Sequence, residues 1–138
     1  MKVKDIIKVI EEFAPLSIQE GWDNSGLCIG SPDASVTSVL LGLDCTPELV
    51  DEAMECGADM IVTHHPLIFS GLKKISPDDQ VGEAVFKAIR AGISIYAAHT
   101  NADKVLAGVS GAMAARLGLE NVSILDEDGE GTGLGVVG

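Results

Sequence analysis

The sequence predicts an α/β fold, with a mainly parallel or mixed sheet and helices packed on its faces. Three short apolar runs, at residues 38–43, 59–63 and 93–98, have the length and composition of buried strands. Segments in which apolar residues recur at helical spacing separate these runs along the chain. Because strands alternate with helices, we expect right-handed crossovers that place the helices on the faces of the sheet.

The first predicted helix covers residues 3–13, where apolar side chains recur at helical spacing. Pro15 ends this helix, because proline lacks the amide hydrogen that would continue it. Residues 17–35 then mix Gly, Pro, Ser, Asn and Asp around a short apolar patch. We therefore expect a loop that contains one short strand at residues 26–29.

The strand at 38–43 leads into a second predicted helix. Thr46 supplies a hydroxyl cap and Pro47 occupies the first helical position, which together are typical of a helix start. Gly57 is expected to end the helix as a left-handed cap, and the strand at 59–63 follows.

The second half of the chain shows the same alternation and then changes character. We expect a loop, a helix, a strand, a helix and a last short strand, at residues 64–79, 80–91, 93–98, 108–117 and 121–125. Residues 126–138 are acidic and rich in glycine, so they resemble a linker or the start of a missing second half. This divides the chain into an α/β metal-binding half-domain at 1–125 and a tail at 126–138.

Composition argues against several classes of protein. Apolar residues make up 46% of the chain and come in periodic blocks, which excludes a mainly disordered protein. The formal charge of −12 argues against nucleic-acid binding, which needs a cationic face. No apolar run approaches the ~20 residues that a membrane span needs. Three cysteines without a CxxC pair favour a reducing compartment, so we expect a cytoplasmic protein.

A histidine or a carboxylate follows each of the three predicted parallel strands. Asp44 follows the first strand, His64 and His65 follow the second, and His99 and Asp103 follow the third. The carboxyl ends of parallel strands lie at one edge of a sheet, where ligands bind. A single histidine at a strand end is more often a loop residue, but here all three histidines converge. Imidazole with carboxylate suits Zn, Mn, Fe or Ni, which predicts a divalent-metal site.

Some of these residues have a second interpretation. Asp44 is as well explained by the entry into the second helix, and we favour that capping role. His99 and Asp103 are four residues apart in a segment that resembles a loop. Asp103 is the better ligand candidate, and His99 could instead orient it. Trp22 and Asp23 lie in a turn-rich segment, where we expect an aromatic plug and, as an alternative, a carboxylate that supports the ligands.

Four segments carry a family resemblance. They are GWDNSGL at 21–27, LDCTP at 43–47, THHPLIF at 63–69 and HTNAD at 99–103. In order and spacing the chain resembles the NGG-one-interacting-factor-three-like family, also described as the dinuclear metal-centre or type-two GTP cyclohydrolase I family. The tail segment 133–135 resembles a further family segment, so the resemblance spans nearly the whole chain.

The resemblance implies an α/β fold whose two halves face each other over a pair of divalent metals. His64, His65 and Asp103 match the metal ligands of the family, and His99 matches a residue near the metal. The resemblance also implies a ring-shaped homo-oligomer. Family members are longer, and their remaining ligands lie on a His-x-x-x-Glu segment of a C-terminal half that this sequence lacks. The chain is therefore expected to be a fragment or a natural truncation.

Two functions from different classes stay open. The chain is the N-terminal half of a divalent-metal hydrolase that acts on a small molecule, with nucleotides such as GTP among the candidates. Alternatively, it is a non-catalytic metal-binding or regulatory interaction module, or an inactive truncated fragment. No catalytic residue can be assigned from the sequence.

Overall fold

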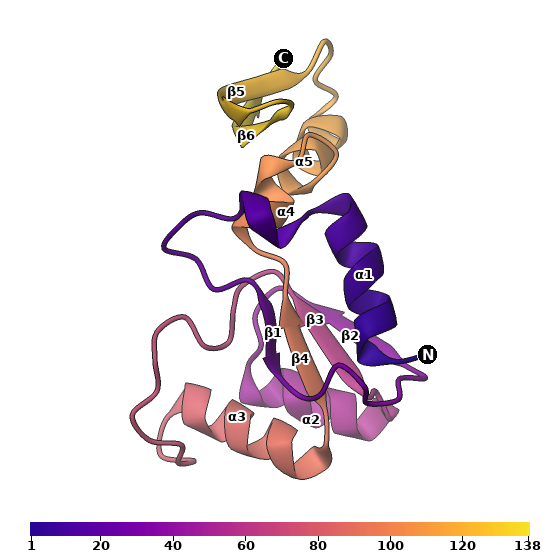
Figure 1. Ribbon diagram of the computed structural model, residues 1–138, viewed down its shortest axis with the longest axis vertical. Helices are drawn as coiled ribbons and strands as arrows, with labels where there is room; N and C mark the ends of the chain where they lie inside the picture. Colours follow the sequence, from indigo (N-terminus) through magenta and orange to yellow (C-terminus); the bar gives the residue numbers. More distant parts are fainter.

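The computed structural model describes residues 1–138 and confirms the predicted α/β fold (Figure 1). Its elements, in chain order, are α1 (Val3–Phe13), the 3-10 helix η1 (Leu16–Ile18), β1 (Gly26–Ile29), β2 (Val39–Gly42), α2 (Pro47–Cys56), β3 (Met60–Thr63), α3 (Gln80–Ala91), β4 (Ser94–Ala97), α4 (Thr100–Lys104), α5 (Val109–Leu117), β5 (Ser123–Gly129) and β6 (Thr132–Val137). The helices predicted at 3–13 and 80–91 have the predicted bounds. None of the helices combines the length and the apolar character that crossing a membrane requires.

The main sheet has four strands in the order β1-β4-β3-β2. The strands β2, β3 and β4 are parallel, so their carboxyl ends lie at one edge of the sheet. The strand β1 pairs with β4 in the antiparallel direction, and Gly26 lies opposite Ala97. The loop that precedes β1 therefore reaches the same edge at which the parallel strands end.

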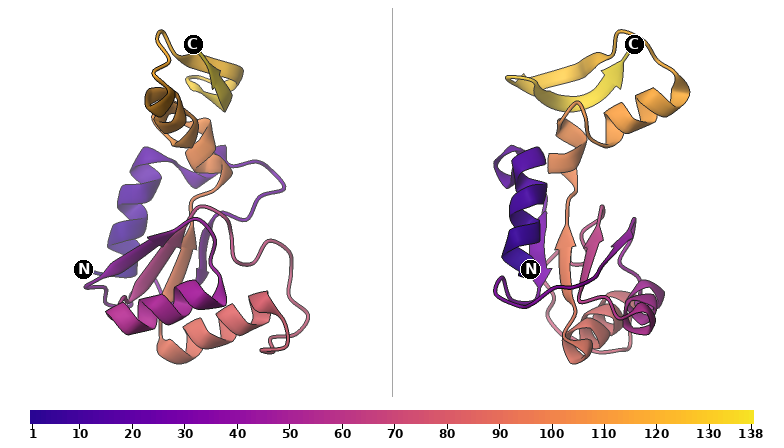
Figure 2. Two further views of the ribbon diagram at one scale, coloured as in Figure 1. Left: turned by 180° about the vertical axis from the view of Figure 1, so that it is seen from behind. Right: turned by 90° about the vertical axis from the view of Figure 1, so that its right-hand side faces the viewer.

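Helices cover both faces of this sheet (Figure 2). The helices α2 and α3 pack on one face, in an apolar cluster that includes Ile61 of β3 and Ile95 of β4. The helix α1 packs on the opposite face, in a second cluster with Met60 and Tyr96. Neighbouring strand residues point to opposite faces, so each central strand contributes to both clusters. These two cores fix the strand ends from which the candidate site residues emerge.

The predicted start and end of α2 are both confirmed. Thr46 is the N-cap, and its hydroxyl accepts a hydrogen bond from the backbone N–H of Leu49 at 3.3 Å. Pro47 occupies the first helical position, and Gly57 ends the helix with a left-handed φ of 72°. Side-chain caps satisfy backbone groups that the helix leaves unpaired, so they set where the loop after β2 meets α2.

Residues 123–137 form an antiparallel hairpin, whereas the sequence indicated a short strand followed by a tail. The strand β5 continues past residue 125, where we expected the tail to begin. Gly131 adopts a φ of 75° in the turn, and a Cβ atom at Gly133 would lie 2.1 Å from the carbonyl oxygen of Asp126. Glycine at these positions permits the turn and the close approach of the strands. The division of the chain into domains stays a prediction.

The hairpin and α5 lie together at one end of the molecule, beyond α4 (Figures 1 and 2). Lys104 of α4 connects this end to the α/β body. Its Nζ atom lies 2.8 Å from Oε1 of Glu20 and also pairs with Asp128 of β5. The Lys104 side chain is only 8% exposed, whereas its partners Glu20 and Asp128 are 27% and 44% exposed, so water reaches the acidic side of this contact.

Candidate metal centre

Four loops meet at the carboxyl edge of the parallel strands. His64 and His65 directly follow β3, and His99 lies between β4 and α4. Asp44 follows β2, and Asp23 lies in the loop that precedes the antiparallel strand β1. The sheet topology therefore brings together side chains from widely separated parts of the sequence.

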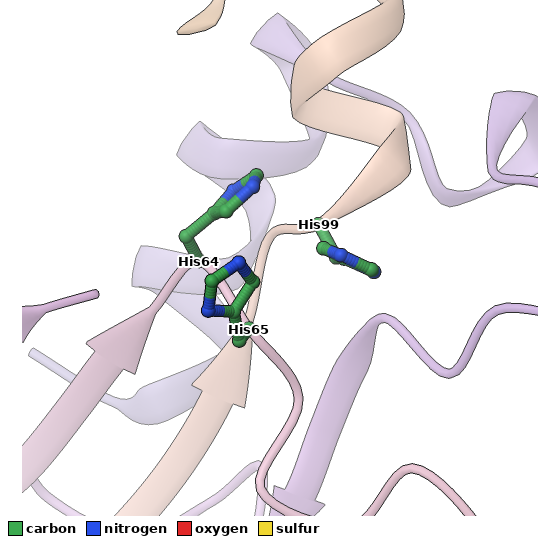
Figure 3. A group of neighbouring side chains, drawn as sticks. All are labelled: His64, His65 and His99. Atoms are coloured by element: carbon green, nitrogen blue, oxygen red, sulfur yellow. The ribbon is translucent and has the colours of Figure 1, made fainter. Parts of the chain in front are cut away.

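The three histidines form one compact group (Figure 3). The ring centroids of His64 and His65 are 4.9 Å apart, and His99 lies 5.1 Å from the first ring and 5.6 Å from the second. One ring nitrogen from each residue lies within 4.8 Å of the other two. Oδ1 of Asp103 is 3.7 Å from Nε2 of His64, so the carboxylate reaches this group as well. We call the four residues the histidine cluster.

The His64 ring is held in one tautomer by the backbone. Its Nδ1 atom lies 2.9 Å from the carbonyl oxygen of Ala98. A carbonyl oxygen can only accept a hydrogen bond, so Nδ1 carries the proton and donates it. In a neutral ring, Nε2 is then left with a lone pair. This is the arrangement in which histidine binds metal ions in proteins.

Carboxylates hold the other two imidazoles in the same way. Nδ1 of His65 lies 2.7 Å from Oδ1 of Asp44, and Nδ1 of His99 lies 2.8 Å from Oδ1 of Asp23. The first pair is half exposed, with side-chain exposures of 46% and 58%, whereas the side chain of Asp23 has no exposed surface. All three imidazoles thus direct Nδ1 at an oxygen acceptor and leave Nε2 available to a ligand.

Asp23 is the most heavily hydrogen-bonded carboxylate at this edge. Beside His99, it accepts hydrogen bonds from the backbone N–H of Asn24, from the hydroxyl of Ser25, and from the backbone and hydroxyl of Thr100. Burial disfavours the charged form, but the hydrogen bonds from Thr100 and His99 outweigh it and hold the pKa of Asp23 well below its usual range. The residue therefore stays ionised, and its contact with His99 is compatible with the alternative interpretation of the sequence, in which Asp23 supports a ligand.

The expectation that Asp44 caps the second helix is wrong. Thr46 occupies the N-cap position and binds the free backbone N–H of the first turn. Asp44 lies two residues earlier, and its carboxylate is paired with His65 instead. Local sequence could not separate the two roles, because a helix entry and a strand end coincide in this short segment.

The segment that carries Asp103 is helical, whereas the sequence indicated a loop. The helix α4 is a single turn that begins after His99, and the backbone N–H of Asp103 donates to the carbonyl oxygen of His99 at 3.1 Å. The turn is anchored from outside, because the buried Asn101 donates from Nδ2 to the carbonyl oxygen of Ala14 at 2.7 Å. Thr100 is held by Asp23, which accepts hydrogen bonds from its backbone N–H and its hydroxyl. These tertiary hydrogen bonds override the weak helix propensity of Thr and Asn.

The expected aromatic plug is also wrong. The Trp22 side chain is 60% exposed, and it lies beside the histidine cluster rather than in a core. A pocket of about 350 Å³ is lined by His65 and Asp44, and by Thr46 and Gln80 at the starts of α2 and α3. The cluster is therefore open to ligands from solvent.

The neighbouring thiols do not belong to the cluster. Burial raises the pKa of Cys28 to about 11 and that of Cys45 to about 12. A thiol binds metal as the thiolate, so both groups are poor ligands at neutral pH. The candidate donors are therefore imidazole and carboxylate alone.

Fold and cluster together define an α/β protein with a histidine-rich candidate metal centre at the carboxyl edge of a mixed sheet. The chain belongs to the Duf34/NIF3 (NGG1p interacting factor 3) family, whose model matches residues 1–138. This match confirms the family resemblance of the sequence motifs.

Known relatives agree in sequence and in structure. A protein of Clostridium acetobutylicum named GTP cyclohydrolase 1 type 2 homolog is 44% identical over 125 residues, which are 91% of this chain and 47% of the relative. A Clostridium perfringens protein of the same name is 42% identical over 127 residues, 92% of this chain and 48% of the relative. This chain therefore spans about half the length of these relatives.

Two solved structures have the same fold. A crystal structure of a Staphylococcus aureus protein superimposes with a TM-score of 0.89 at 41% identity, and covers 93% of this chain and 36% of that one. A Bacillus cereus protein related to NIF3 superimposes with a TM-score of 0.86 at 42% identity, and covers 90% of this chain and 34% of its own. This chain thus shares its mixed α/β architecture with both structures.

Proposed function

We propose that this protein binds divalent metal through His64, His65 and Asp103, with His99 in the same cluster. The observation that carries the proposal is the hydrogen-bonding arrangement that the three imidazoles share. Each one directs Nδ1 at an oxygen acceptor, so that Nε2 is left as a donor of an electron pair. A structural role alone needs no such shared arrangement in three neighbouring rings.

The chemistry of the donors fits a transition metal or zinc. Imidazole nitrogen with carboxylate oxygen suits Zn, Fe, Mn or Ni, whereas Ca²⁺ and Mg²⁺ prefer oxygen ligands throughout. His64, His99 and Asp103 are partly buried, with side-chain exposures of 19%, 17% and 25%. This degree of burial shields the donors and still lets a small ligand reach them.

We further propose that the chain is part of a metal-dependent hydrolase that acts on a small molecule. A bound divalent cation supplies Lewis-acid activation of water and of the substrate. His64, His65, His99 and Asp103 would hold the cation, and Ala98, Asp44 and Asp23 orient the three imidazoles through hydrogen bonds to Nδ1. The name of the clostridial relatives supports a nucleotide such as GTP as the substrate.

A cytoplasmic location and a homo-oligomeric state complete the proposal. All three cysteines are free, which favours a reducing compartment. Apolar side chains of α5 are exposed, among them Met113 at 60% and Leu117 at 74%. Exposed apolar surface of this kind favours association with a further copy or a further domain.

Metal content measured on purified protein tests the metal site. The wild type is equilibrated with Zn²⁺ or Mn²⁺, dialysed without chelator and analysed by mass spectrometry, beside the double variant His64→Ala/Asp103→Ala. We expect the double variant to lose at least about 100-fold in affinity, since residues behind the ligands alone contribute roughly 10–100-fold. The matched control is Asp33→Asn, an exposed carboxylate that pairs only with Lys2 and Lys4. Equal metal content in the wild type and the double variant contradicts the proposal.

A non-catalytic metal-binding module is the second candidate function. The observation that favours it is the arrangement of the three imidazoles, which accounts for metal binding by itself and requires no turnover. Turnover assays with a panel of nucleotides separate the two candidates. Hydrolysis that depends on added metal supports the enzyme, whereas metal binding without turnover supports the module.

A further inference from the structure

Two exposed aromatic side chains flank the histidine cluster. Trp22 is 60% exposed and Phe69 is 54% exposed, although both are large apolar groups. Their ring centroids are 6.1 Å apart, and they lie 6.3 Å and 6.5 Å from the ring of His99. Trp22 is the only tryptophan of the chain, and it contributes little to either apolar core. Core packing therefore does not account for its position.

The backbone on both sides of this aromatic pair is held in place. Trp22 precedes Asp23, whose buried carboxylate is fixed by five hydrogen-bond donors. Nδ2 of Asn24 donates to the carbonyl oxygen of Ile68 at 2.6 Å, which joins the Trp22 loop to the residue before Phe69. The two rings are thus displayed by connected segments, and a ligand would need little ordering of the loops on binding.

We propose that Trp22 and Phe69 form a stacking subsite for a planar heteroaromatic ring the size of a nucleobase, beside the metal centre. The proposal rests on the proposed function, since it names the part of a substrate that this side of the same site recognises. Exposed aromatic faces bind nucleobases by stacking, and this binding does not depend on hydrogen bonds to the edges of the base. The distance of this pair from His99 places such a ring next to the histidine cluster.

The geometry of the pair limits how a ring can bind. The planes of Trp22 and Phe69 are inclined at 52°, so one ligand ring cannot lie parallel to both. It stacks on one face and meets the other ring at an angle, an arrangement that aromatic groups favour. The indole has the larger face, which makes Trp22 the stacking platform and Phe69 the side wall.

Charge at the site favours recognition of the ring over that of a phosphate. Asp23, Asp44 and Asp103 surround the histidines, and no Lys or Arg forms an ion pair with any of them. An anionic group is therefore repelled unless a cation occupies the cluster. We expect a neutral nucleoside to bind this subsite with or without metal, and the phosphates of a nucleotide to add affinity only with metal present.

Tryptophan fluorescence tests the subsite, because Trp22 is the only emitter of its kind in the chain. The full chain is titrated with guanosine, and with ribose 5-phosphate as the matched ligand without a base, in the presence and absence of Zn²⁺ or Mn²⁺. We expect saturable quenching by guanosine and none by ribose 5-phosphate in the absence of metal. Phe69→Ala keeps the reporter and is expected to weaken guanosine binding roughly tenfold, within the range of base–aromatic stacking.

Matched variants separate stacking from general damage. Phe86→Ala removes a second exposed phenylalanine, on α3 away from the cluster, and is expected to leave guanosine affinity unchanged. Trp22→Phe is expected to retain binding and Trp22→Leu to lose roughly tenfold to a hundredfold, both measured by calorimetry. Circular dichroism of each variant confirms that the fold is intact.

Several results would overturn the subsite. They are equal responses to guanosine and ribose 5-phosphate, full affinity in Trp22→Leu, or emission that changes with protein concentration alone, which means that another copy covers the pair. Metal content measured on the same samples separates this proposal from the proposed function. Metal binding without guanosine quenching removes the subsite alone, whereas quenching without metal binding removes the metal centre and leaves the subsite.

Discussion

Nδ1 of His99 lies 2.8 Å from Oδ1 of Asp23, although 76 positions of the sequence separate the two residues. The contact exists because β1 runs antiparallel to β4, which brings the loop before β1 to the strand end that carries His99. The side chain of Asp23 has no exposed surface. A buried carboxylate thus sets the orientation of an imidazole in the candidate metal centre.

Replacing Asp23 by Asn should weaken both the fold and the metal centre. Every partner of Asp23 is a hydrogen-bond donor, so the amide group of Asn would face donors and leave its own N–H groups without an acceptor. We expect Asp23→Asn to lower the free energy of unfolding by about 1–3 kcal/mol and metal affinity by roughly 10–100-fold. Urea unfolding and metal titration measure the two effects. A variant with wild-type values for both would show that the contact has no such role.

Acid should remove the contribution of Asp23 to stability. Burial opposes its ionisation, but the hydrogen bonds from Thr100 and His99 prevail and hold the pKa below the usual range in the folded state. The unfolded state therefore binds this proton more readily, and the stabilisation is present above the usual pKa of about 3.9 and lost as the pH falls below it. We expect the difference in unfolding free energy between the wild type and Asp23→Asn to shrink below about pH 4. A difference that stays constant from about pH 6 to about pH 2.5 contradicts this account.

Asp44→Asn should have a smaller effect than Asp23→Asn. Asp44 also binds the Nδ1 atom of an imidazole, but it and His65 are half exposed, so water can replace the carboxylate. We expect a change in stability within about 0.5 kcal/mol and a loss of metal affinity below roughly tenfold. The two Asn variants control for each other, because both remove one negative charge beside a histidine. A larger loss of stability or of metal affinity in Asp44→Asn than in Asp23→Asn would contradict the ranking that we expect from burial.

Elements with local causes could be predicted from the sequence. The helices α1 and α3 begin and end where the apolar spacing and the turn residues place them, and the ends of the parallel strands differ from the prediction by at most one residue. The convergence of the histidines also followed from local information, because parallel strands end at a common edge. Thr46 and Gly57 were recognisable because capping depends on residues within one turn.

Features that depend on distant contacts could not be predicted in the same way. The pairing of Asp44 with His65 joins positions 21 residues apart, and nothing in either segment distinguishes it from helix capping. The turn of α4 forms because Asn101 donates a tertiary hydrogen bond to Ala14 and Thr100 donates one to Asp23, not because of its own propensities. Trp22 was expected to be an aromatic plug in a turn, but its side chain is exposed beside His99, and this placement depends on contacts that its residue type does not specify.

Gly133→Ala should destabilise the β5–β6 hairpin and leave the stability of the α/β body unchanged. A Cβ atom at this position would lie 2.1 Å from the carbonyl oxygen of Asp126 and 2.7 Å from the Cα atom of Glu127, so backbone must move to admit it. We expect hydrogen exchange to accelerate in β5 and β6 while α2, α3 and the main sheet keep their protection, with a local cost of about 1–3 kcal/mol. Gly71→Ala is the matched control, because a Cβ atom there meets nothing within 4 Å. Equal protection of the hairpin in the two variants would mean that the strands do not approach as closely as the structure shows, and faster exchange throughout the α/β body would mean that the hairpin and the body unfold together.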